Sequence, residues 1–328
     1  MEPIDYMNIT WHDKFANSWL DRVKQGREPH AVLLAGPAGV GKRAAAAWIA
    51  SLRLGNGARF DMPQYPAEPP THADLRIVAP LEDKQSIGID QIRELVAEFS
   101  LTSYKGKGKV TIIEPANAMT ISAANSLLKT LEEPPGDALL ILVADKSGKL
   151  PATIFSRCQR IDFAVPAVAD GLEWLDRLQP GAVWSQALAL AGNAPLAAIA
   201  ALEQLDTHVA MGRDFAAVGR GSASALEIAA KWTKLDAPFV LDWLARQVQH
   251  GALLGLTGQK TAVSGVIDET VLKRIDRRNL FCYLDIINGL RGQPAGSFNK
   301  QLTLESLLID WAEGLKNTGQ DSLRDPLR

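Results

Sequence analysis

The sequence predicts an α/β domain built on a parallel sheet, followed by two all-helical domains. In the first half of the chain, short apolar runs alternate with stretches whose apolar residues recur at helical spacing. This is the pattern of strands joined by covering helices. A glycine-rich loop joins the first apolar run to the first long helical stretch, as in phosphate-binding α/β proteins. After Pro166 the strand-like runs stop, and Ala- and Leu-rich helical patterns continue.

Five short, mostly apolar runs are the predicted strands. Runs of this length and composition are typical of strands that are buried in a parallel sheet. In chain order they are residues 31–35, 75–79, 110–113, 138–144 and 160–164. Because helical stretches separate them, we expect these strands to run parallel to one another.

Three helices are predicted between these strands, because their apolar residues form one stripe that can face the sheet. The stripes are Ala45, Trp48, Ile49 and Leu52; Ile89, Ile92, Val96 and Phe99; and Ala124, Leu127, Leu128 and Leu131. Pro134 and Pro135 end the third helix, since neither residue can donate a helical hydrogen bond.

The chain divides into three predicted domains and a tail. We expect the α/β domain over residues 1–166, a small helical lid domain over 167–205 and a larger helical domain over 206–316. Residues 317–328 are polar and are expected to be disordered. Residues 55–71 are rich in Gly and Pro, which predicts an irregular insertion between a helix and a strand.

The glycine-rich loop has the sequence GPAGVGK and opens the first long helix. Gly36, Gly39 and Gly41 allow backbone N–H groups to turn inward around phosphate oxygens. Lys42 would reach the terminal phosphates of a nucleotide. The loop therefore predicts a phosphate-loop fold, although a fold does not by itself establish an activity.

Two groups that ATP hydrolysis needs are missing from this chain. Arg43 follows the lysine, where such loops have a Ser or Thr whose hydroxyl coordinates Mg²⁺. A guanidinium has no lone pair for a metal. The third strand of this architecture normally ends in an acidic pair, but here it ends in Glu114 and Pro115, and proline cannot act as a base. We therefore expect a degenerate phosphate loop and no intrinsic ATPase activity.

Two further strings are long and specific. Residues 125–135 read NSLLKTLEEPP, and Ser156, Arg157 and Cys158 precede the last predicted strand. With these strings the sequence resembles the AAA+ subunits of the bacterial DNA polymerase III clamp loader over most of residues 10–200. The strings SIGIDQIREL (residues 86–95) and NKQLTLESLLIDW (residues 299–311) extend the resemblance.

The resemblance implies that Ser156, Arg157 and Cys158 form the SRC motif of this family. Arg157 would then be an arginine finger that reaches into the ATP site of a neighbouring subunit, where a guanidinium stabilises charge on the transferred phosphoryl group. The local alternative is that Arg157 caps a helix or pairs with a carboxylate. The resemblance also implies a hetero-pentameric ring with tau/gamma and delta subunits, held together by residues 206–316, that loads a sliding clamp onto primed DNA.

Two more positions fit a subunit that does not turn over ATP. Active relatives sense the γ-phosphate with Thr or Asn after the fourth strand, where this chain has Asp145, and Pro195 replaces an arginine of their lid domain. The competing hypothesis is an active phosphate-loop ATPase in which Glu114 alone holds Mg²⁺. A third hypothesis keeps weak nucleotide or phosphate binding without hydrolysis, because Gly41 and Lys42 are retained.

Composition excludes several other functions. The chain has 35 Lys and Arg against 37 Asp and Glu, so no whole-chain field would bind nucleic acid or an anionic membrane. Cys158 and Cys282 are too few for a four-thiolate zinc site, and residues 51–80, where many relatives insert one, contain no cysteine. The longest apolar run is too short to cross a bilayer, and the N-terminus lacks a signal pattern. We expect a cytoplasmic protein with no required cofactor, no zinc and no membrane partner.

Overall fold

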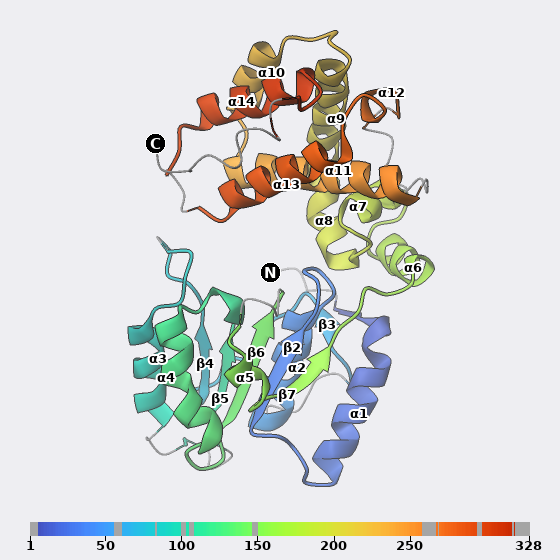
Figure 1. Cartoon of the computed structure of the whole chain (residues 1–328). Coiled ribbons are helices and arrows are strands. Elements are labelled where there is room, and N and C mark those ends of the chain that lie inside the picture. The colour runs from blue at the N-terminus through green and yellow to red at the C-terminus, as the bar shows by residue number, and fades with distance from the viewer. Residues whose placement is uncertain are drawn as a thin grey trace. The chain divides into compact units, whose positions relative to one another are not determined.

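The computed structural model describes most of the chain (Figure 1). The described residues are 6–55, 61–82, 84–99, 103–104, 108–145, 150–257, 267, 269–293, 297–316 and 318. The chain forms two compact units, Met1–Ala201 and Leu202–Arg328. The predicted disordered tail lies outside the described residues, apart from Thr318.

The N-terminal unit is built on a five-stranded parallel sheet with the strand order β4-β5-β6-β2-β7. Its strands are β2 (Ala31–Ala35), β4 (Leu75–Val78), β5 (Val110–Ile113), β6 (Leu139–Ala144) and β7 (Gln159–Asp162). The five predicted strands are therefore confirmed to within two residues at each end. Strands β2 and β6 pair at the centre of the sheet and are buried at every position, which explains why they are apolar throughout.

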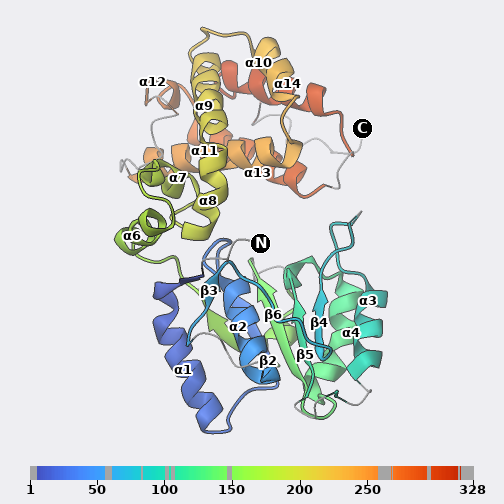
Figure 2. The same ribbon diagram turned by 180° about the vertical axis from the view of Figure 1, so that it is seen from behind.

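Helices cover both faces of this sheet, as Figures 1 and 2 show from opposite sides. They are α1 (Asp13–Lys24), α2 (Lys42–Leu54), α3 (Ile89–Phe99), α4 (Ile121–Glu132) and the short α5 (Ala152–Phe155). Successive residues of β2 point to opposite faces. Leu33 packs into a core with α3 and α4, whereas Val32 and Leu34 pack into a second core with α1 and α2.

The predicted irregular insertion contains a short strand, which corrects that prediction. Here β3 (Gln64–Tyr65) pairs antiparallel with β1 (Met7–Asn8) near the start of the chain. Trp174 lies against this pair, because its indole Nε1 donates to Asn8 O at 2.7 Å and its ring contacts Tyr65. A two-residue strand held by partners so distant in sequence has no local pattern to predict it.

The lid helices of the N-terminal unit are α6 (Val168–Leu178), α7 (Trp184–Leu190) and α8 (Pro195–Glu203). The next helix, α9, begins at Leu205, so the predicted boundary after residue 205 falls one residue inside it. No single helix among the described residues is long and apolar enough to cross a membrane. The bent pair α7 and α8 meets the length and composition criteria only when both helices are taken together.

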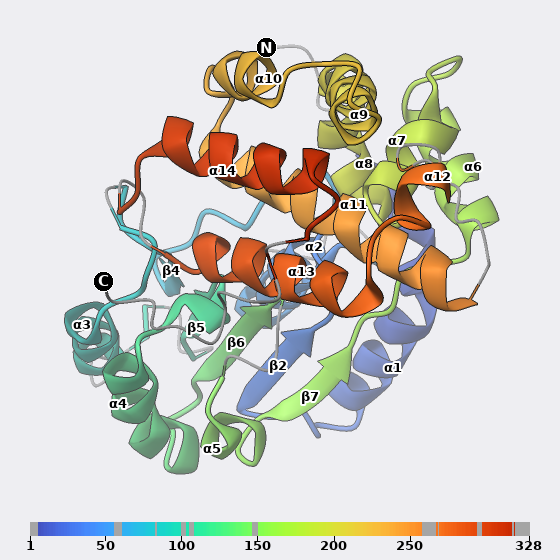
Figure 3. The ribbon, with the colours of Figure 1, turned by 45° about the horizontal axis from the view of Figure 1, so that its top comes forward.

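The C-terminal unit is entirely helical in its described residues (Figure 3). Its helices are α9 (Leu205–Gly219), α10 (Ala225–Trp232), α11 (Ala237–Thr257), α12 (Glu269–Leu272), α13 (Arg277–Arg291) and α14 (Lys300–Ala312). Helix α11 packs along α13, and α10 packs along α14. The parallel α/β domain followed by an all-helical region confirms the predicted fold class.

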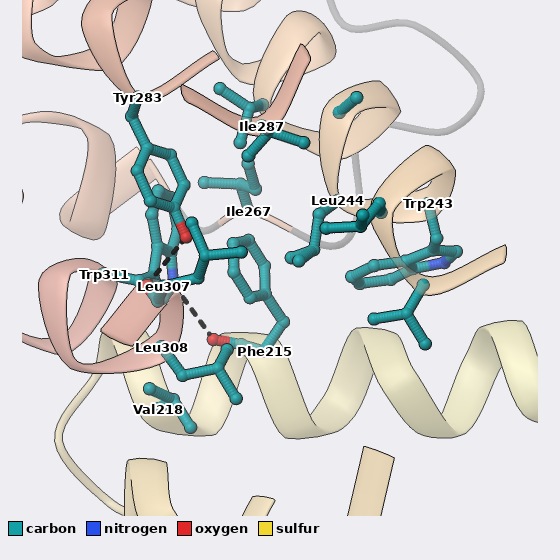
Figure 4. Packing of buried hydrophobic residues seen from close by; sticks show 14 of the residues in the cluster. Phe215, Val218, Trp243, Leu244, Ile267, Tyr283, Ile287, Leu307, Leu308 and Trp311 are labelled. Atoms are coloured by element: carbon teal, nitrogen blue, oxygen red, sulfur yellow. Dashed lines mark hydrogen bonds between the residues drawn. The ribbon is translucent and has the colours of Figure 1, made fainter. Parts of the chain in front are cut away.

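Aromatic side chains pack among aliphatic ones in the core of the C-terminal unit (Figure 4). Phe215 stacks on Trp311 with 4.2 Å between ring centroids, and the Trp311 indole donates to the Phe215 carbonyl. The Tyr283 hydroxyl donates to the Leu307 carbonyl at 2.7 Å, which satisfies the polar end of a fully buried ring. These bonds bring together side chains from α9, α13 and α14.

Candidate functional site

The phosphate loop connects β2 to α2 and packs tightly against its surroundings. Gly36 and Gly39 both have positive φ. A Cβ atom on Gly36 would lie 2.1 Å from the Phe163 carbonyl oxygen, and one on Gly39 would lie 2.4 Å from Ala197 Cβ. Glycine is therefore required here by close packing as well as by backbone conformation.

Lys42, which would contact phosphates in an active loop, is already paired. Its Nζ lies 2.7 Å from Asp145 Oδ1 and donates to the Pro37 carbonyl at 2.5 Å. The lysine side chain is only 3% exposed. Asp145 directly follows β6, and β6 pairs with β2 so that Ala144 is opposite Ala35. The parallel pairing thus brings this carboxylate to the edge of the sheet at which the phosphate loop begins.

Arg43 is also paired with a carboxylate. Its Nε donates to Glu114 Oε2 at 2.9 Å, with Glu114 at the end of β5. The arginine side chain is mostly exposed, so this pair contributes at most about 1 kcal/mol to stability. The pair matters more for metal binding. Glu114 is the one acidic residue retained at the end of β5, and Arg43 already binds its carboxylate.

The lid and the N-terminal segment close around the same loop. The Leu196 backbone N–H of α8 donates to the Gly39 carbonyl at 3.0 Å. On another side, Trp11 Nε1 donates to the Val40 carbonyl, and His12 Nε2 lies 2.9 Å from that same oxygen. Burial lowers the pKa of the His12 imidazole to about 4, although its hydrogen bond to Val40 opposes the shift. His12 is therefore neutral near pH 7 and can donate from Nε2.

These contacts make the residues present a poor fit for a magnesium nucleotide. The loop lysine is neutralised by Asp145, and the residue that should ligate Mg²⁺ is an arginine bound to Glu114. Ala197 occupies the space next to Gly39. The loop keeps the fold of a phosphate site, while its charged groups satisfy one another.

The SRC residues follow α5, and their surroundings differ from one residue to the next. Cys158 is buried in the core between the sheet and α4, and burial raises the pKa of its thiol to about 12. This cysteine therefore lies in a packing position, where the thiolate form is disfavoured. Arg157 is 31% exposed, and its Nε donates to Glu132 Oε1 at 2.6 Å.

The remaining contacts of Arg157 are also local. Its Nη2 pairs with the same Glu132 oxygen, and its Nη1 donates to the Thr153 carbonyl at 3.1 Å and to Ser156 Oγ at 3.0 Å. The partners of Arg157 thus come from α4 and α5, whereas Lys42 and Arg43 are paired at the ends of β6 and β5. In the free chain this geometry is the carboxylate pairing that the sequence offers as the local alternative.

Two partners in these pairs escaped the sequence analysis. Glu132 was part of the specific string NSLLKTLEEPP, but nothing in that string identifies Arg157 as its partner. Asp145 is identified from sequence only as the replacement of a γ-phosphate sensor, and its position there does not indicate an ion pair with Lys42. The strand order could have suggested the pair between Lys42 and Asp145. Strands β2 and β6 are neighbours in the sheet, so the residues that follow them lie close together.

Comparison with known proteins decides the family. The family model described as "DNA polymerase III, delta subunit" matches residues 11–167. The DNA polymerase III subunit delta' of Pseudomonas aeruginosa is 31% identical over 317 residues, which cover 90% of this chain and 95% of that protein. The chain belongs to the delta prime family of DNA polymerase III clamp-loader subunits. This membership confirms the resemblance that the sequence strings indicated.

Other delta prime proteins match over a shorter region. The subunit from Haemophilus influenzae is 37% identical over 138 residues, which is 41% of each chain. Among solved structures, a gamma subunit-related protein of Thermotoga maritima covers 91% of this chain and 99% of its own, with a TM-score of 0.52 and 19% identity. That likeness concerns the fold alone.

Within the described part of the chain, no group of three or more His, Cys, Asp or Glu side chains is placed to hold a metal ion.

Proposed function

We propose that this delta prime-family chain serves the clamp loader without hydrolysing ATP and donates Arg157 to ATP bound by a neighbouring tau/gamma subunit. The observation that carries the proposal is the ion pair between Lys42 and Asp145. In this pair the Lys42 ammonium, which a phosphate-loop ATPase needs for the phosphates of its nucleotide, is bound to a carboxylate of the same chain.

Nucleotide entry would have to undo this pair. A nucleotide that displaced Asp145 from Lys42 would bring phosphate charge next to a carboxylate, and like charges at such distances repel. A metal-bound nucleotide would also meet Arg43, which is already paired with Glu114. These obstacles support a subunit that requires no cofactor of its own, and they argue against the competing hypothesis of an active ATPase.

Arg157 has the chemistry for a role in trans. A guanidinium is planar, permanently charged and able to donate a hydrogen bond to a phosphate oxygen. Its SRC position follows α5 and is partly exposed, so a neighbouring subunit can approach it. Where such fingers have been dissected, they contribute about 10³–10⁵ in rate.

The C-terminal unit is proposed to assemble with tau/gamma and delta subunits in a hetero-pentameric ring. Several apolar side chains on its helices are exposed, as expected of a unit that also has to bind other chains. They include Leu226, Leu253, Leu256, Phe281, Leu302 and Ile309. The assembled ring would load the sliding clamp onto primed DNA during chromosome replication in the cytoplasm.

The test is ATP hydrolysis by the reconstituted clamp loader in the presence of primed DNA. Five samples are needed: the isolated chain, the loader without it, the loader with it, and the loader with either Arg157→Ala or Arg93→Ala. Arg93→Ala, an exposed arginine on α3, is the matched control. We expect no turnover by the isolated chain and at least a tenfold loss with Arg157→Ala alone. Hydrolysis by the isolated chain would instead support the active-ATPase hypothesis.

A further inference from the structure

We infer that Glu132 is a positioning residue for Arg157, holding its guanidinium in the orientation in which it meets the phosphates of a neighbouring subunit's ATP. This inference rests on the proposed function, because it assigns a role to the contact of the proposed finger. Glu132 Oε1 accepts the Arg157 Nε–H at 2.6 Å and also pairs with Nη2. A carboxylate on this side of a guanidinium fixes the direction of the side chain.

The two residues are held in register by the core beneath them. Glu132 is the last residue of α4, and the preceding Leu131 is 1% exposed. Cys158, which follows Arg157, is 8% exposed and packs in the same core as Leu131. Each member of the ion pair is therefore next to a buried residue, and the distance between their backbones is set by packing rather than by the charges.

The donors of Arg157 are almost fully assigned. Nε and one N–H of Nη2 go to Glu132, and Nη1 donates to the Thr153 carbonyl and to Ser156 Oγ. Among the described residues, one N–H of the five in the guanidinium is left without a partner. The free subunit thus presents an oriented guanidinium with a donor in reserve. Because the guanidinium is already oriented, the side chain loses less conformational entropy when the neighbouring subunit docks.

Stability is a poor explanation for this pair. Both side chains are partly exposed, and exposed ion pairs contribute little to folding. Position matters far more for a group that stabilises a transition state, because a misplacement of about 1 Å can cost about 10²-fold in rate. Loss of the Glu132 charge should therefore affect hydrolysis and leave folding nearly unchanged.

The chain offers a matched control in the next residue. Glu133 has the same side chain and is exposed, and its backbone N–H, at the end of α4, donates to the Lys129 carbonyl. Glu133→Gln removes the same charge from the same surface. A purely electrostatic effect on subunit association would be shared by both substitutions, whereas positioning of Arg157 is specific to Glu132.

The experiment measures kcat and KM for ATP in the reconstituted loader with primed DNA. The variants are Glu132→Gln, Glu132→Ala, Glu133→Gln, Arg157→Ala and the double variant Glu132→Gln/Arg157→Ala, each checked for assembly and thermal unfolding. We expect Glu132→Gln to lower kcat roughly tenfold with KM changed less than about twofold. Glu133→Gln should match the wild type. In the Arg157→Ala background, Glu132→Gln should have no further effect, because a positioning residue acts only through the group that it positions.

Three results with Glu132→Gln would overturn the inference alone, and one result with Arg157→Ala would overturn the proposed function as well. A wild-type kcat with Glu132→Gln, beside a slow Arg157→Ala loader, overturns the inference and leaves the proposed function intact. A faster Glu132→Gln loader also overturns it, because the ion pair would then restrain the finger. So does an effect of Glu132→Gln that persists without Arg157. If Arg157→Ala itself keeps the wild-type rate, the proposed function has failed, and the inference fails with it.

Discussion

Lys42 Nζ and Asp145 Oδ1 are 2.7 Å apart, and the lysine side chain is almost fully buried. The pair joins the first residue of α2 to the residue that follows β6. Asp145 is 42% exposed, so this carboxylate is the accessible member of the pair. The phosphate loop thus keeps its glycines and its lysine, and the lysine is paired within the chain.

Removal of the Asp145 charge should partly restore anion binding. In Asp145→Asn, Lys42 loses its charged partner and becomes available to a phosphate group. We expect the isolated variant to bind inorganic triphosphate at least several-fold more tightly than the wild type, measured by calorimetry. Asp137→Asn, an exposed carboxylate elsewhere in the unit, is the control. Equal binding by wild type and Asp145→Asn would mean that the packing of Ala197 closes the site.

The contact between the loop and the lid predicts a stability difference between two glycines. Gly39 and Gly26 both have positive φ, but a Cβ on Gly26 meets nothing within 4 Å. Gly26→Ala should cost about 1–2 kcal/mol from backbone strain alone. Gly39→Ala should cost about 1–3 kcal/mol more, because Ala197 must move. Urea unfolding of the two variants measures the difference, and equal losses would show that the lid is not packed on the loop.

The lowered pKa of His12 predicts that the free energy of unfolding depends on pH. Its pKa is about 4 in the folded chain, against an ordinary 6.5, so the unfolded chain binds more protons between these values. Stability therefore rises with pH from about 4 to 6.5 and is level above that, with a slope of at most about 1.4 kcal/mol per pH unit from this residue.

His12→Gln tests that assignment, because glutamine keeps a donor for the Val40 carbonyl but does not titrate. Unfolding of wild type and variant is compared at pH 4.5, 5.5 and 7. The variant should show a shallower rise over this range. His208, whose pKa is also lowered to about 4 by burial and by Arg246, leaves a residual slope in the variant. Identical pH profiles for the two proteins would refute the role of His12.

Cys158 should resist alkylation in the native protein. Its thiol is buried and its pKa is raised to about 12, so the reactive thiolate is scarce near neutral pH. Cys282 is only partly buried. Treatment with iodoacetamide at pH 8 followed by peptide mass analysis should find modification at Cys282 before Cys158. Faster labelling at Cys158 would contradict its packing role.

The sheet was predictable from sequence because its central strands leave little ambiguity. Strands β2 and β6 are apolar and buried at every position, so local composition alone indicates them. Helix α1 was not predicted. Only Ala16 and Trp19 of its residues are buried, and two buried positions give a weak periodic signal. Strand β3 depends on its pairing with β1, which no local pattern encodes.

The candidate site was predictable in its residues but not in its contacts. The glycines, Lys42 and the replacement at Arg43 could all be identified from spacing, because each has a fixed place in the loop. The partners Asp145, Glu114 and Glu132 come from other strands and helices. Such ion pairs follow from tertiary packing, which a single sequence does not specify.

We propose that this chain acts through Arg157 and has no use for a nucleotide on its own phosphate loop. One comparison tests it: the rate of DNA-stimulated ATP hydrolysis by loaders reconstituted with Lys42→Ala and with Arg157→Ala. We expect a wild-type rate with Lys42→Ala and a loss of tenfold or more with Arg157→Ala. A loss with Lys42→Ala and a wild-type rate with Arg157→Ala would contradict it, because the phosphate loop would then be the working site of the chain.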